Sequence, residues 1–329
     1  MTIYDIAKEA GVAASTVSRV INNKPGIKAE TRKKIQELLK EYNYIPNEAA
    51  RGLVMQATKI IGILVVDIRV SHHTDGAYII EKELTALGYC CIIFNTGHEE
   101  EKKEKYLRIL EQRRVDGVIL IGSTFQCERV KEGIRQFLRQ VPVVIANGYL
   151  DLPNVYGILV DEMNGVQQCV GLMHSKGHSK LAFVLDDHTP SNHSKQKGFI
   201  DGMVELGWKQ ETVWLYETES SLEGGYSITK RIVAEHPDIE GIVFSVDLTA
   251  VGGIRALTDL GILIPDQVAV MGVDNTIYGE ICYPKLTSLN NKLNDLSVMA
   301  ARTLIDALEG RQNPQKIMLF SSIVEREST

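Results

Sequence analysis

Residues 3–22 read IYDIAKEAGVAASTVSRVIN, and they contain side chains that could recognise the edges of bases in a nucleic acid. The guanidinium of Arg19 can donate two hydrogen bonds to the major-groove edge of guanine. Ser15 can hydrogen-bond to several bases, so it would discriminate less, whereas Ala14 can offer only an apolar contact, for example to a thymine methyl group. The alternative for Arg19 is a solvated arginine on a small helix.

Three short helices are predicted to position these side chains. Residues 3–10 place their apolar side chains on one face of a helix that Gly11 ends, and residues 15–21 repeat the pattern with two valines and an isoleucine facing inward. A third helix is expected over residues 29–42, after a loop that contains Pro25 and Gly26. Two short helices joined by a tight, glycine-containing turn predict a helix-turn-helix unit.

The charge of the chain is distributed unevenly. Residues 1–58 hold nine Lys or Arg and six Asp or Glu, a net charge of +3, whereas the whole chain carries −6 and the remainder therefore −9. A basic head on an acidic body concentrates the attraction for phosphate in the head. By itself the asymmetry is also compatible with chance.

From Lys59 onward, apolar runs alternate with segments of helical periodicity. Strands are predicted at 60–68, 90–94, 115–122 and 141–147, and a second series at 181–185, 213–216, 241–246 and 268–274. Helices are predicted between them, at 75–87, 99–112, 128–138, 162–176, 194–206, 223–235 and 248–260. This alternation predicts an α/β body of two doubly wound parallel-sheet lobes, with ligands bound beyond the carboxyl ends of the strands.

Several other classes of protein are disfavoured. The five cysteines show no metal-ligand spacing, which favours free thiols in a reducing cytoplasm, no metal and no cofactor. No apolar run reaches about 18 residues, and the N-terminus has no apolar segment typical of a signal peptide, so a cytoplasmic protein without a membrane span is expected. No phosphate-binding loop, GxGxxG motif after a strand or GxSxG motif occurs, which argues against an enzyme.

The motif at 3–22 has further companions along the chain: YIPNEAARGL at 44–53, GVDN at 272–275, PKLTS at 284–288 and VEREST at 324–329. Together, in this order, they resemble the LacI/GalR family of bacterial transcriptional regulators over essentially the whole chain. The resemblance implies a helix-turn-helix domain at 1–45, a hinge helix or linker at 46–58 and a periplasmic-binding-protein-like body at 59–329. Its N-lobe would comprise about 59–160 and 288–317, and its C-lobe about 161–287 and 318–329.

The resemblance also implies contacts with double-stranded operator DNA. Ala14, Ser15 and Arg19 fall where family members present side chains to base edges. Ala13 stands where a Ser or Thr N-cap is usual, so Ser15 could cap the helix one turn later instead of reading bases. The other implied positions are Tyr4, Thr16, Ser18 and Asn22 at phosphates, and Ala50 and Leu53 in the hinge. Leu53 corresponds to the side chain that inserts into the central base step, the alternative being an ordinary linker residue.

For the effector cleft, the resemblance places ten residues at the pocket by position: Asp67, His72, His73, Thr189, Ser191, Lys195, Ser220, Asp247, Asp274 and Asn291. Lys195 replaces the usual Arg, which loses bidentate binding but keeps a point charge. Because of the two histidines, a carboxylate or phosphorylated ligand is an alternative to a sugar or sugar derivative. For any one of these residues, the alternative is a solvated loop side chain.

The resemblance thus predicts a DNA-binding regulator, expected to be a repressor, that binds a pseudo-palindromic operator as a homodimer and responds to a small-molecule effector. The leucine heptads that form tetramers in the family would follow residue 329, and this sequence does not contain them. A dimer is therefore expected. An exported solute-binding protein would share the two-lobed body but would have no use for the helix-turn-helix head. The sequence identifies neither the effector nor whether it induces or corepresses.

Overall fold

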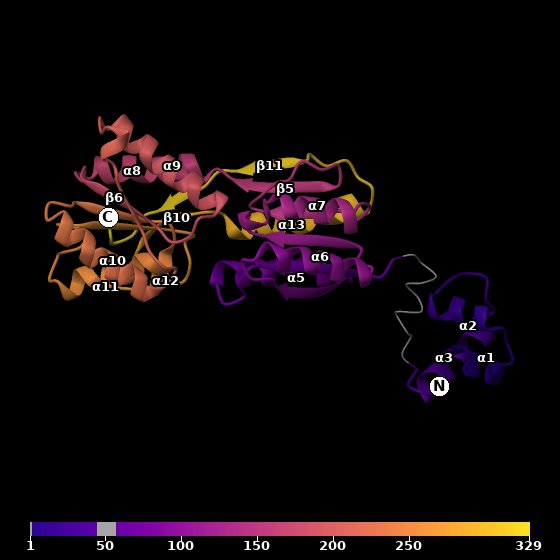
Figure 1. Cartoon of the computed structure of the whole chain (residues 1–329). Helices are drawn as coiled ribbons and strands as arrows, with labels where there is room; N and C mark the ends of the chain where they lie inside the picture. Colours follow the sequence, from indigo (N-terminus) through magenta and orange to yellow (C-terminus); the bar gives the residue numbers. More distant parts are fainter. Residues whose placement is uncertain (1, 45–56) are drawn as a thin grey trace. The chain divides into compact units, whose positions relative to one another are not determined.

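A computed structural model describes residues 2–44 and 57–329, and the chain divides into two compact units, 1–58 and 59–329 (Figure 1). The predictions for most of the 46–58 segment, including Ala50 and Leu53, lie outside the described residues. None of the helices in the described parts is both long enough and apolar enough to cross a membrane.

The N-terminal unit contains three helices, α1 (Ile3–Ala10), α2 (Ala14–Ile21) and α3 (Ala29–Glu41). Thr2 and Asp5 form a reciprocal capping box at the start of α1, in which the Thr2 backbone N–H donates to the Asp5 carboxylate over 2.7 Å. Gly11 ends α1 with a φ of +72°, a conformation that glycine adopts without steric cost. These local signals confirm the predicted first helix and the turn that follows it.

A small hydrophobic core holds the three helices of this unit together. Ile6, Val17 and Ile35 come from one helix each, and all three side chains are completely buried. Ala7, Ala10 and Val20 complete the buried cluster. Because each helix contributes one apolar face, the opposite faces of α1 and α2 stay available to solvent.

The first lobe of the body is a six-stranded parallel sheet in the order β11-β5-β4-β3-β1-β2. Its strands are β1 (Ile60–Val65), β2 (Cys90–Asn95), β3 (Gly117–Ile121), β4 (Val143–Ala146), β5 (Val155–Val160) and β11 (Lys316–Leu319). One buried cluster joins the sheet to α5 (Ser71–Ala86) and α13 (Leu293–Leu308). Another joins it to α6 (Glu100–Gln112) and α7 (Glu128–Phe137), so helices cover both faces (Figure 1).

The second lobe repeats this design with the strand order β12-β10-β9-β8-β6-β7, in which only β12 is antiparallel. Its strands are β6 (Leu181–Leu185), β7 (Trp214–Glu217), β8 (Gly241–Phe244), β9 (Ala269–Val273), β10 (Thr287–Asn290) and β12 (Ser322–Val324). On one face lie α8 (Glu162–Ser175) and α9 (Pro190–Glu205), and on the other α10 (Leu222–Glu235) and α11 (Asp247–Asp259). A short helix, α12 (Tyr278–Ile281), follows β9. The predicted fold class, a helix-turn-helix unit and two doubly wound lobes, is confirmed.

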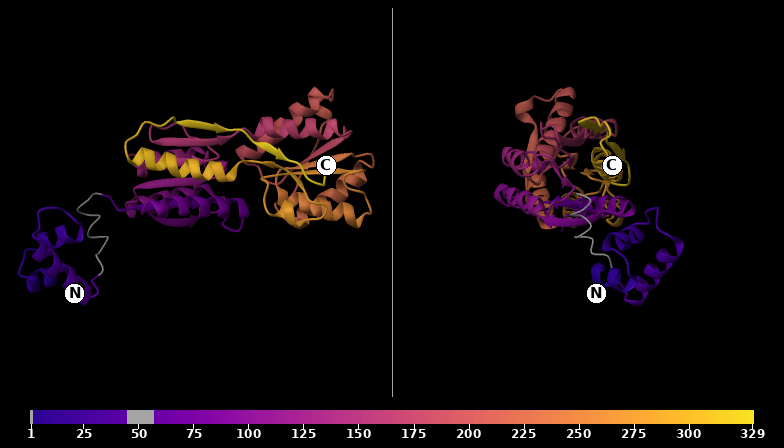
Figure 2. Two further views of the ribbon diagram at one scale, coloured as in Figure 1. Left: turned by 180° about the vertical axis from the view of Figure 1, so that it is seen from behind. Right: turned by 90° about the vertical axis from the view of Figure 1, so that its right-hand side faces the viewer.

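The chain passes between the lobes three times: after β5, after β10 and after β11 (Figure 2). The crossings are hydrogen-bonded to one another, because Asn291 Nδ2 donates to Glu162 Oε1 over 3.1 Å and Ser321 Oγ donates to the Asp161 carbonyl over 3.2 Å. The strands place the second crossing about three residues later than expected and the third about two residues later. β10 still pairs within the second sheet, and β11 extends the first sheet to Leu319.

The structure contains elements that the periodicity of the sequence did not predict. They are β5, β10, α13, β11 and β12, of which α13 has a clear apolar stripe buried against the first sheet. Helix α5 also begins four residues earlier than expected, at Ser71, without a side-chain cap at Val70. The earlier start is significant because it puts His72 and His73 in the first turn of a helix rather than in a loop.

Candidate nucleic-acid interface and ligand cavity

One side of α2 carries exposed polar side chains. Val17 and Val20 are buried in the core of the N-terminal unit, whereas Ser15 and Arg19, four residues apart, are exposed on the opposite side of the helix. The guanidinium of Arg19 makes no hydrogen bond or ion pair with any other described residue. The five donors of Arg19 are thus available for a partner outside the unit.

The start of α2 shows whether Ser15 caps the helix in place of Ala13. Ala13 occupies the N-cap without a side-chain hydrogen bond, and the helix begins at Ala14. Ser15 is therefore already the second helical residue, and its exposed hydroxyl is not used for capping. The competing role considered for Ser15 is absent from the structure.

The remaining predicted DNA-contacting residues of this unit differ in availability. Tyr4 is 74% exposed on α1, and Thr16 and Ser18 are half-buried. Asn22 donates through Nδ2 to the Ser18 carbonyl over 2.8 Å, so this amide already stabilises the end of α2. Its Oδ1 is buried without a hydrogen-bond partner among the described residues.

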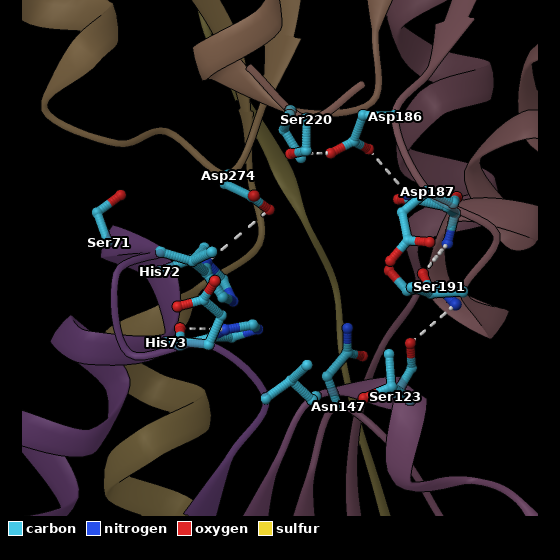
Figure 3. A pocket seen from close by; sticks show the side chains of 18 of the residues that line it. Ser71, His72, His73, Ser123, Asn147, Asp186, Asp187, Ser191, Ser220 and Asp274 are labelled. Carbon is cyan, nitrogen blue, oxygen red and sulfur yellow. Dashed lines mark hydrogen bonds and ion pairs between the residues drawn. The ribbon is translucent and has the colours of Figure 1, made fainter. Parts of the chain in front are cut away.

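In the body, a cavity of about 790 Å³ lies at the carboxyl ends of the strands of both lobes (Figure 3). Nine of the ten predicted effector residues line it: Asp67, His72, His73, Thr189, Ser191, Lys195, Ser220, Asp247 and Asp274. Asn291 is not part of the wall but donates through Nδ2 to Asp274 Oδ1 over 2.9 Å. The structure thus brings these ten residues together from segments more than 200 residues apart.

Asp274 occupies an unusual backbone position directly after β9. Its φ is +98°, which L-residues rarely adopt, and this conformation is stabilised by its surroundings. His72 of the first lobe approaches Asp274 Oδ1 with its Nδ1 at 3.9 Å (Figure 3). Burial opposes ionisation, but His72, Lys195 and Asn291 together lower the pKa of Asp274. The carboxylate therefore stays charged where the two lobes meet.

Lys195 projects from α9 into a fully buried position. Its Nζ donates to Asn192 Oδ1 over 3.2 Å and to the Ser245 carbonyl over 3.0 Å, and it lies 3.8 Å from Glu162 Oε1. Burial works against its charge, but the surrounding carboxylates, above all Asp274 and Glu162, raise the pKa of Lys195. The charge of this lysine serves mainly to balance neighbouring carboxylates.

Asp247 begins α11 and is held almost entirely by its own lobe. It accepts hydrogen bonds from Ser288 Oγ over 2.6 Å and from the Thr276 backbone N–H and hydroxyl over 2.6 and 2.9 Å. Burial raises the pKa of Asp247 to about 7. Although Asp247 lines the cavity, its hydrogen bonds mainly tie α11 to the loop after β9.

Asp67 and His73 are linked to each other and to a neighbouring arginine. Arg69 donates through Nη2 and Nε to the Asp67 carboxylate over 2.6 and 3.0 Å, which lowers the pKa of Asp67 to about 2. His73 Nδ1 lies 3.0 Å from the Asp67 carbonyl, so it acts as the donor. Burial and the neighbouring His72 lower the pKa of His73, which favours its neutral form.

Four contacts join the lobes across the cavity, and Figure 3 shows His72 facing Asp274 and Ser191 facing Ser123. One of the four is the hydrogen bond that Asn147 Nδ2 donates to Glu162 Oε1 over 3.4 Å. Besides the pair of His72 and Asp274, the backbone N–H of Ser191 donates to Ser123 Oγ over 3.1 Å. On the rim, His98 Nδ1 lies 3.7 Å from Asp187 Oδ2. All four connect the first lobe to the second, so they depend on the separation of the lobes.

Two other predicted residues use their hydroxyls within the second lobe. Thr189 caps α9 by accepting from the Asn192 backbone N–H over 3.1 Å. Ser220 donates to Asp186 Oδ2 over 2.6 Å, and Asp186 Oδ1 accepts from Ser245 Oγ over 2.6 Å. These side chains shape the wall of the cavity more than they offer free hydrogen-bonding atoms to it.

Several residues of the cavity wall were not predicted from the sequence. Asn147 follows β4, and a search for polar residues just after predicted strands, where Asp247 and Asp274 also lie, could have found it. The same signal applies to Ser123, Asp186, Asp187 and Glu219, whereas Ser71, His98 and Glu162 required the tertiary structure. Among the described residues, no group of histidines, cysteines and carboxylates is arranged to hold a metal ion.

Two buried polar atoms on the cavity side of the first lobe lack hydrogen-bond partners within the described chain. They are His72 Nδ1 and Thr124 Oγ1, and both residues line the cavity. Buried polar atoms are nearly always hydrogen-bonded to protein, water or ligand. These two atoms are therefore available to a polar molecule in the cavity.

Comparison with known proteins gives matches along the whole chain. Residues 2–47 match the family model for bacterial regulatory proteins of the lacI family, and residues 170–329 match that for a periplasmic binding protein-like domain. The HTH-type transcriptional regulator RegA of Clostridium saccharobutylicum is 32% identical over 332 residues, which cover 100% of this chain and 99% of that protein.

Two solved structures extend the comparison. The lac repressor dimer bound to operator and the anti-inducer ONPF superposes with a TM-score of 0.90 at 22% identity, covering 100% of this chain and 98% of that one. A periplasmic binding protein/LacI transcriptional regulator from Alkaliphilus metalliredigens QYMF, complexed with D-xylulofuranose, is 27% identical. It covers 82% of this chain and 99% of that one, with a TM-score of 0.71.

Proposed function

We propose that this chain, which belongs to the lacI family of bacterial regulatory proteins, is a repressor that binds a pseudo-palindromic operator as a homodimer. It is a DNA-binding transcriptional regulator, and a small polyhydroxylated effector in the inter-lobe cavity controls it. One observation carries the proposal. The same chain has exposed polar side chains on α2 that are not bonded within the unit, and a polar cavity built by both lobes.

In this proposal α2 enters the major groove of the operator. Arg19 pairs with a guanine, and Ser15 and Ala14 contact neighbouring base edges. Tyr4, Thr16 and Ser18 bind phosphates, and Asn22 supports this face through its hydrogen bond to Ser18. Ala50 and Leu53 act in the hinge, with Leu53 inserted at the central base step.

The exposed apolar side chains of the body support a dimer. Tyr78 on α5 is 63% exposed, and Ile281 and Tyr283, at the end of α12 and just after it, are 70% and 88% exposed. Figure 1 places α5 and α12 along the same side of the body. Large apolar side chains exposed on these elements favour a protein interface there, and two-fold symmetry of such an interface implies an operator with two half-sites.

The effector would act by binding one arrangement of the lobes more tightly than another. Asp274 and Lys195 belong to the second lobe, whereas His72, His73 and Asn147 belong to the first. A ligand that contacts both sets changes the separation of the lobes, and it can influence DNA only by its difference in affinity for the two arrangements. The lobe movement reaches the DNA through the hinge and the dimer interface.

The test begins with the operator, which is selected from random duplexes with the full-length protein. Binding is then followed by fluorescence anisotropy between 50 and 200 mM salt, and the mass of the complex by sedimentation. The proposal expects a dimer on a two-fold site, and an affinity that falls steeply with salt because phosphate contacts release counterions. A protein that binds the DNA as a monomer, or an affinity that does not change with salt concentration, would contradict the proposal.

A thermal-shift screen of sugars and their derivatives tests the effector half of the proposal. A ligand that binds the folded state raises the melting temperature in proportion to its affinity and concentration. Each hit is added to the operator complex, and a release of DNA identifies an inducer, whereas a tightening identifies a corepressor. Repression is then tested with a reporter gene placed behind the selected operator.

A further inference from the structure

Carboxylates outnumber permanent cations along the wall of the inter-lobe cavity. Only one arginine and one lysine, Arg69 and Lys195, occur among the described residues that line it. Seven carboxylates face them: Asp67, Glu162, Asp186, Asp187, Glu219, Asp247 and Asp274. The charge of the wall therefore bears on the class of effector that the cavity accepts.

Neither cation is free to neutralise an anionic ligand. The guanidinium of Arg69 forms a bidentate pair with Asp67, and the side chain is otherwise 87% exposed to solvent. Lys195 is buried, with its Nζ hydrogen-bonded to Asn192 and Ser245 and close to Glu162. Moving either cation to a ligand would leave a carboxylate of the wall without its partner.

Several of the carboxylates are also engaged, but two on the second lobe are not fully used. Asp186 and Asp247 each accept three or more hydrogen bonds from their own lobe. Asp187 Oδ1 accepts a hydrogen bond from the His188 backbone N–H over 2.7 Å, but Asp187 Oδ2 has only the loose pair with His98, at 3.7 Å. The side chain of Glu219 has no ion pair or hydrogen bond with any described residue. Both follow neighbouring parallel strands, β6 and β7.

We propose that the effector is a polyhydroxylated compound without an acidic group, and that the cavity favours one with a protonated amine directed toward Asp187 and Glu219. This inference rests on the proposed function above. The hydroxyl groups find partners at Ser123, Asn147 and Asp274, and the amine finds the two available carboxylates. A sugar phosphate or uronic acid meets surplus negative charge in a site without a free cation. The phosphorylated or carboxylate ligand left open by the sequence is therefore disfavoured.

The test uses matched sets of hexoses that differ in one substituent. Glucose, glucosamine, glucose 6-phosphate and glucuronate form one set, and the corresponding galactose and mannose compounds form two others. Each is titrated into the full-length protein by calorimetry at 50 and 300 mM salt. On the scaffold that binds, the amino sugar should bind several-fold more tightly than the neutral sugar at low salt, with a smaller difference at high salt. The phosphate and the uronate should bind at least tenfold more weakly.

Two variants localise the effect. Glu219→Gln removes an available carboxylate from the wall and should reduce the ratio between amino-sugar and neutral-sugar affinity. Glu223→Gln removes the same charge from an exposed position on α10 that does not line the cavity, and it should leave this ratio unchanged. Equal reductions in the two variants would overturn the assignment to Glu219.

The outcomes separate the two proposals. A phosphate or uronate that binds as tightly as its neutral parent overturns the charge inference and leaves the proposed sugar-responsive regulator intact. If no sugar of any charge binds, the proposed effector class itself fails, and the inference fails with it. An amino sugar that binds no more tightly than the neutral sugar overturns the roles of Asp187 and Glu219.

Discussion

The exposed face of α2 and the wall of the inter-lobe cavity use polar side chains in opposite ways. On α2, Ser15 and Arg19 point to solvent and keep their hydrogen-bonding groups uncommitted. In the cavity, Asp247 and Lys195 are buried and bound to neighbours that come from several elements. A residue on α2 can therefore be changed with little effect on the fold, whereas many cavity residues support both the fold and the site.

The largest loss of stability is expected at Lys195, a buried cavity residue whose charge balances neighbouring carboxylates. Lys195→Met keeps the length of the side chain but leaves Glu162 and Asp274 without their cation, which should cost about 3–5 kcal/mol of stability. Urea unfolding of the full-length protein measures this loss. The matched control is Lys197→Met on the same helix, whose exposed pair with Asp201 should contribute less than about 1 kcal/mol. Equal losses of stability in the two variants would refute the proposed difference between the buried Lys195 and the exposed Lys197.

Asp247 makes the stability of the body depend on pH. Its pKa of about 7 in the folded state, against about 3.8 in the unfolded state, means that the folded state holds this proton more tightly. The contribution is present below pH 4 and is lost as the pH rises through 7, and the pKa difference corresponds to roughly 4 kcal/mol at most. Asp247→Asn should remove this term, so that the variant gains stability relative to the wild type between pH 5 and pH 8.

Urea unfolding at several pH values checks the prediction for Asp247. The exposed Asp266→Asn serves as the control, because it removes a carboxylate without a buried environment. A stability difference between Asp247→Asn and the wild type that stays constant from pH 5 to pH 8 would show that this carboxyl does not titrate near neutrality.

Asp274→Ala should separate the cavity from the DNA-binding face. Loss of this charged acceptor should weaken effector binding by about 100-fold, which corresponds to the usual contribution of hydrogen bonds to a charged group. Operator affinity without effector should change little, because α2 belongs to the other unit. Operator titrations with and without the screened ligand measure both quantities. If operator binding by the variant still responds normally to the ligand, the role of Asp274 is purely structural. If the variant loses operator binding without ligand, Asp274 holds the lobes together.

Arg19→Ala should cost about 1–3 kcal/mol of discrimination at one base pair in each half-site. Because Arg19 has no partner among the described residues, the stability of the unit should remain unchanged. Anisotropy titrations with the operator and with single-base variants measure the discrimination, and Lys33→Ala on α3 is the control for loss of one exposed positive charge. If Arg19→Ala weakened all sequences equally, Arg19 would be a phosphate contact.

The smallest expected effect is a gain. Ala13→Ser would supply the side-chain cap that α2 lacks, stabilising the helix by about 1 kcal/mol. Hydrogen exchange in the full-length protein should then slow roughly fivefold for the amides of α2, with α1, already capped by Thr2, as the internal reference. An unchanged exchange rate in α2 would mean that another interaction limits the opening of this helix.

The sequence alone determined the α2 face and the class of the body. A single helix places residues by its own periodicity, so Ser15 and Arg19 could be assigned to one exposed side before the structure was known. The alternation of apolar runs and helices likewise predicted two parallel-sheet lobes, and the family resemblance placed Asp247 and Asp274 at the cavity. The pattern was weaker at β5, β10 and β12, which follow loops rather than long helices.

Only the tertiary structure decided which cavity residues are available to a ligand. Asp247 and Glu219 are both acidic residues near the ends of strands, but one is saturated by Ser288 and Thr276 and the other has no partner among the described residues. Hydrogen bonds between segments far apart in sequence leave no local pattern. The position of His72 beside Asp274 likewise required α5 to begin at Ser71 and the two lobes to meet, because neither residue carries a sequence signal for the other.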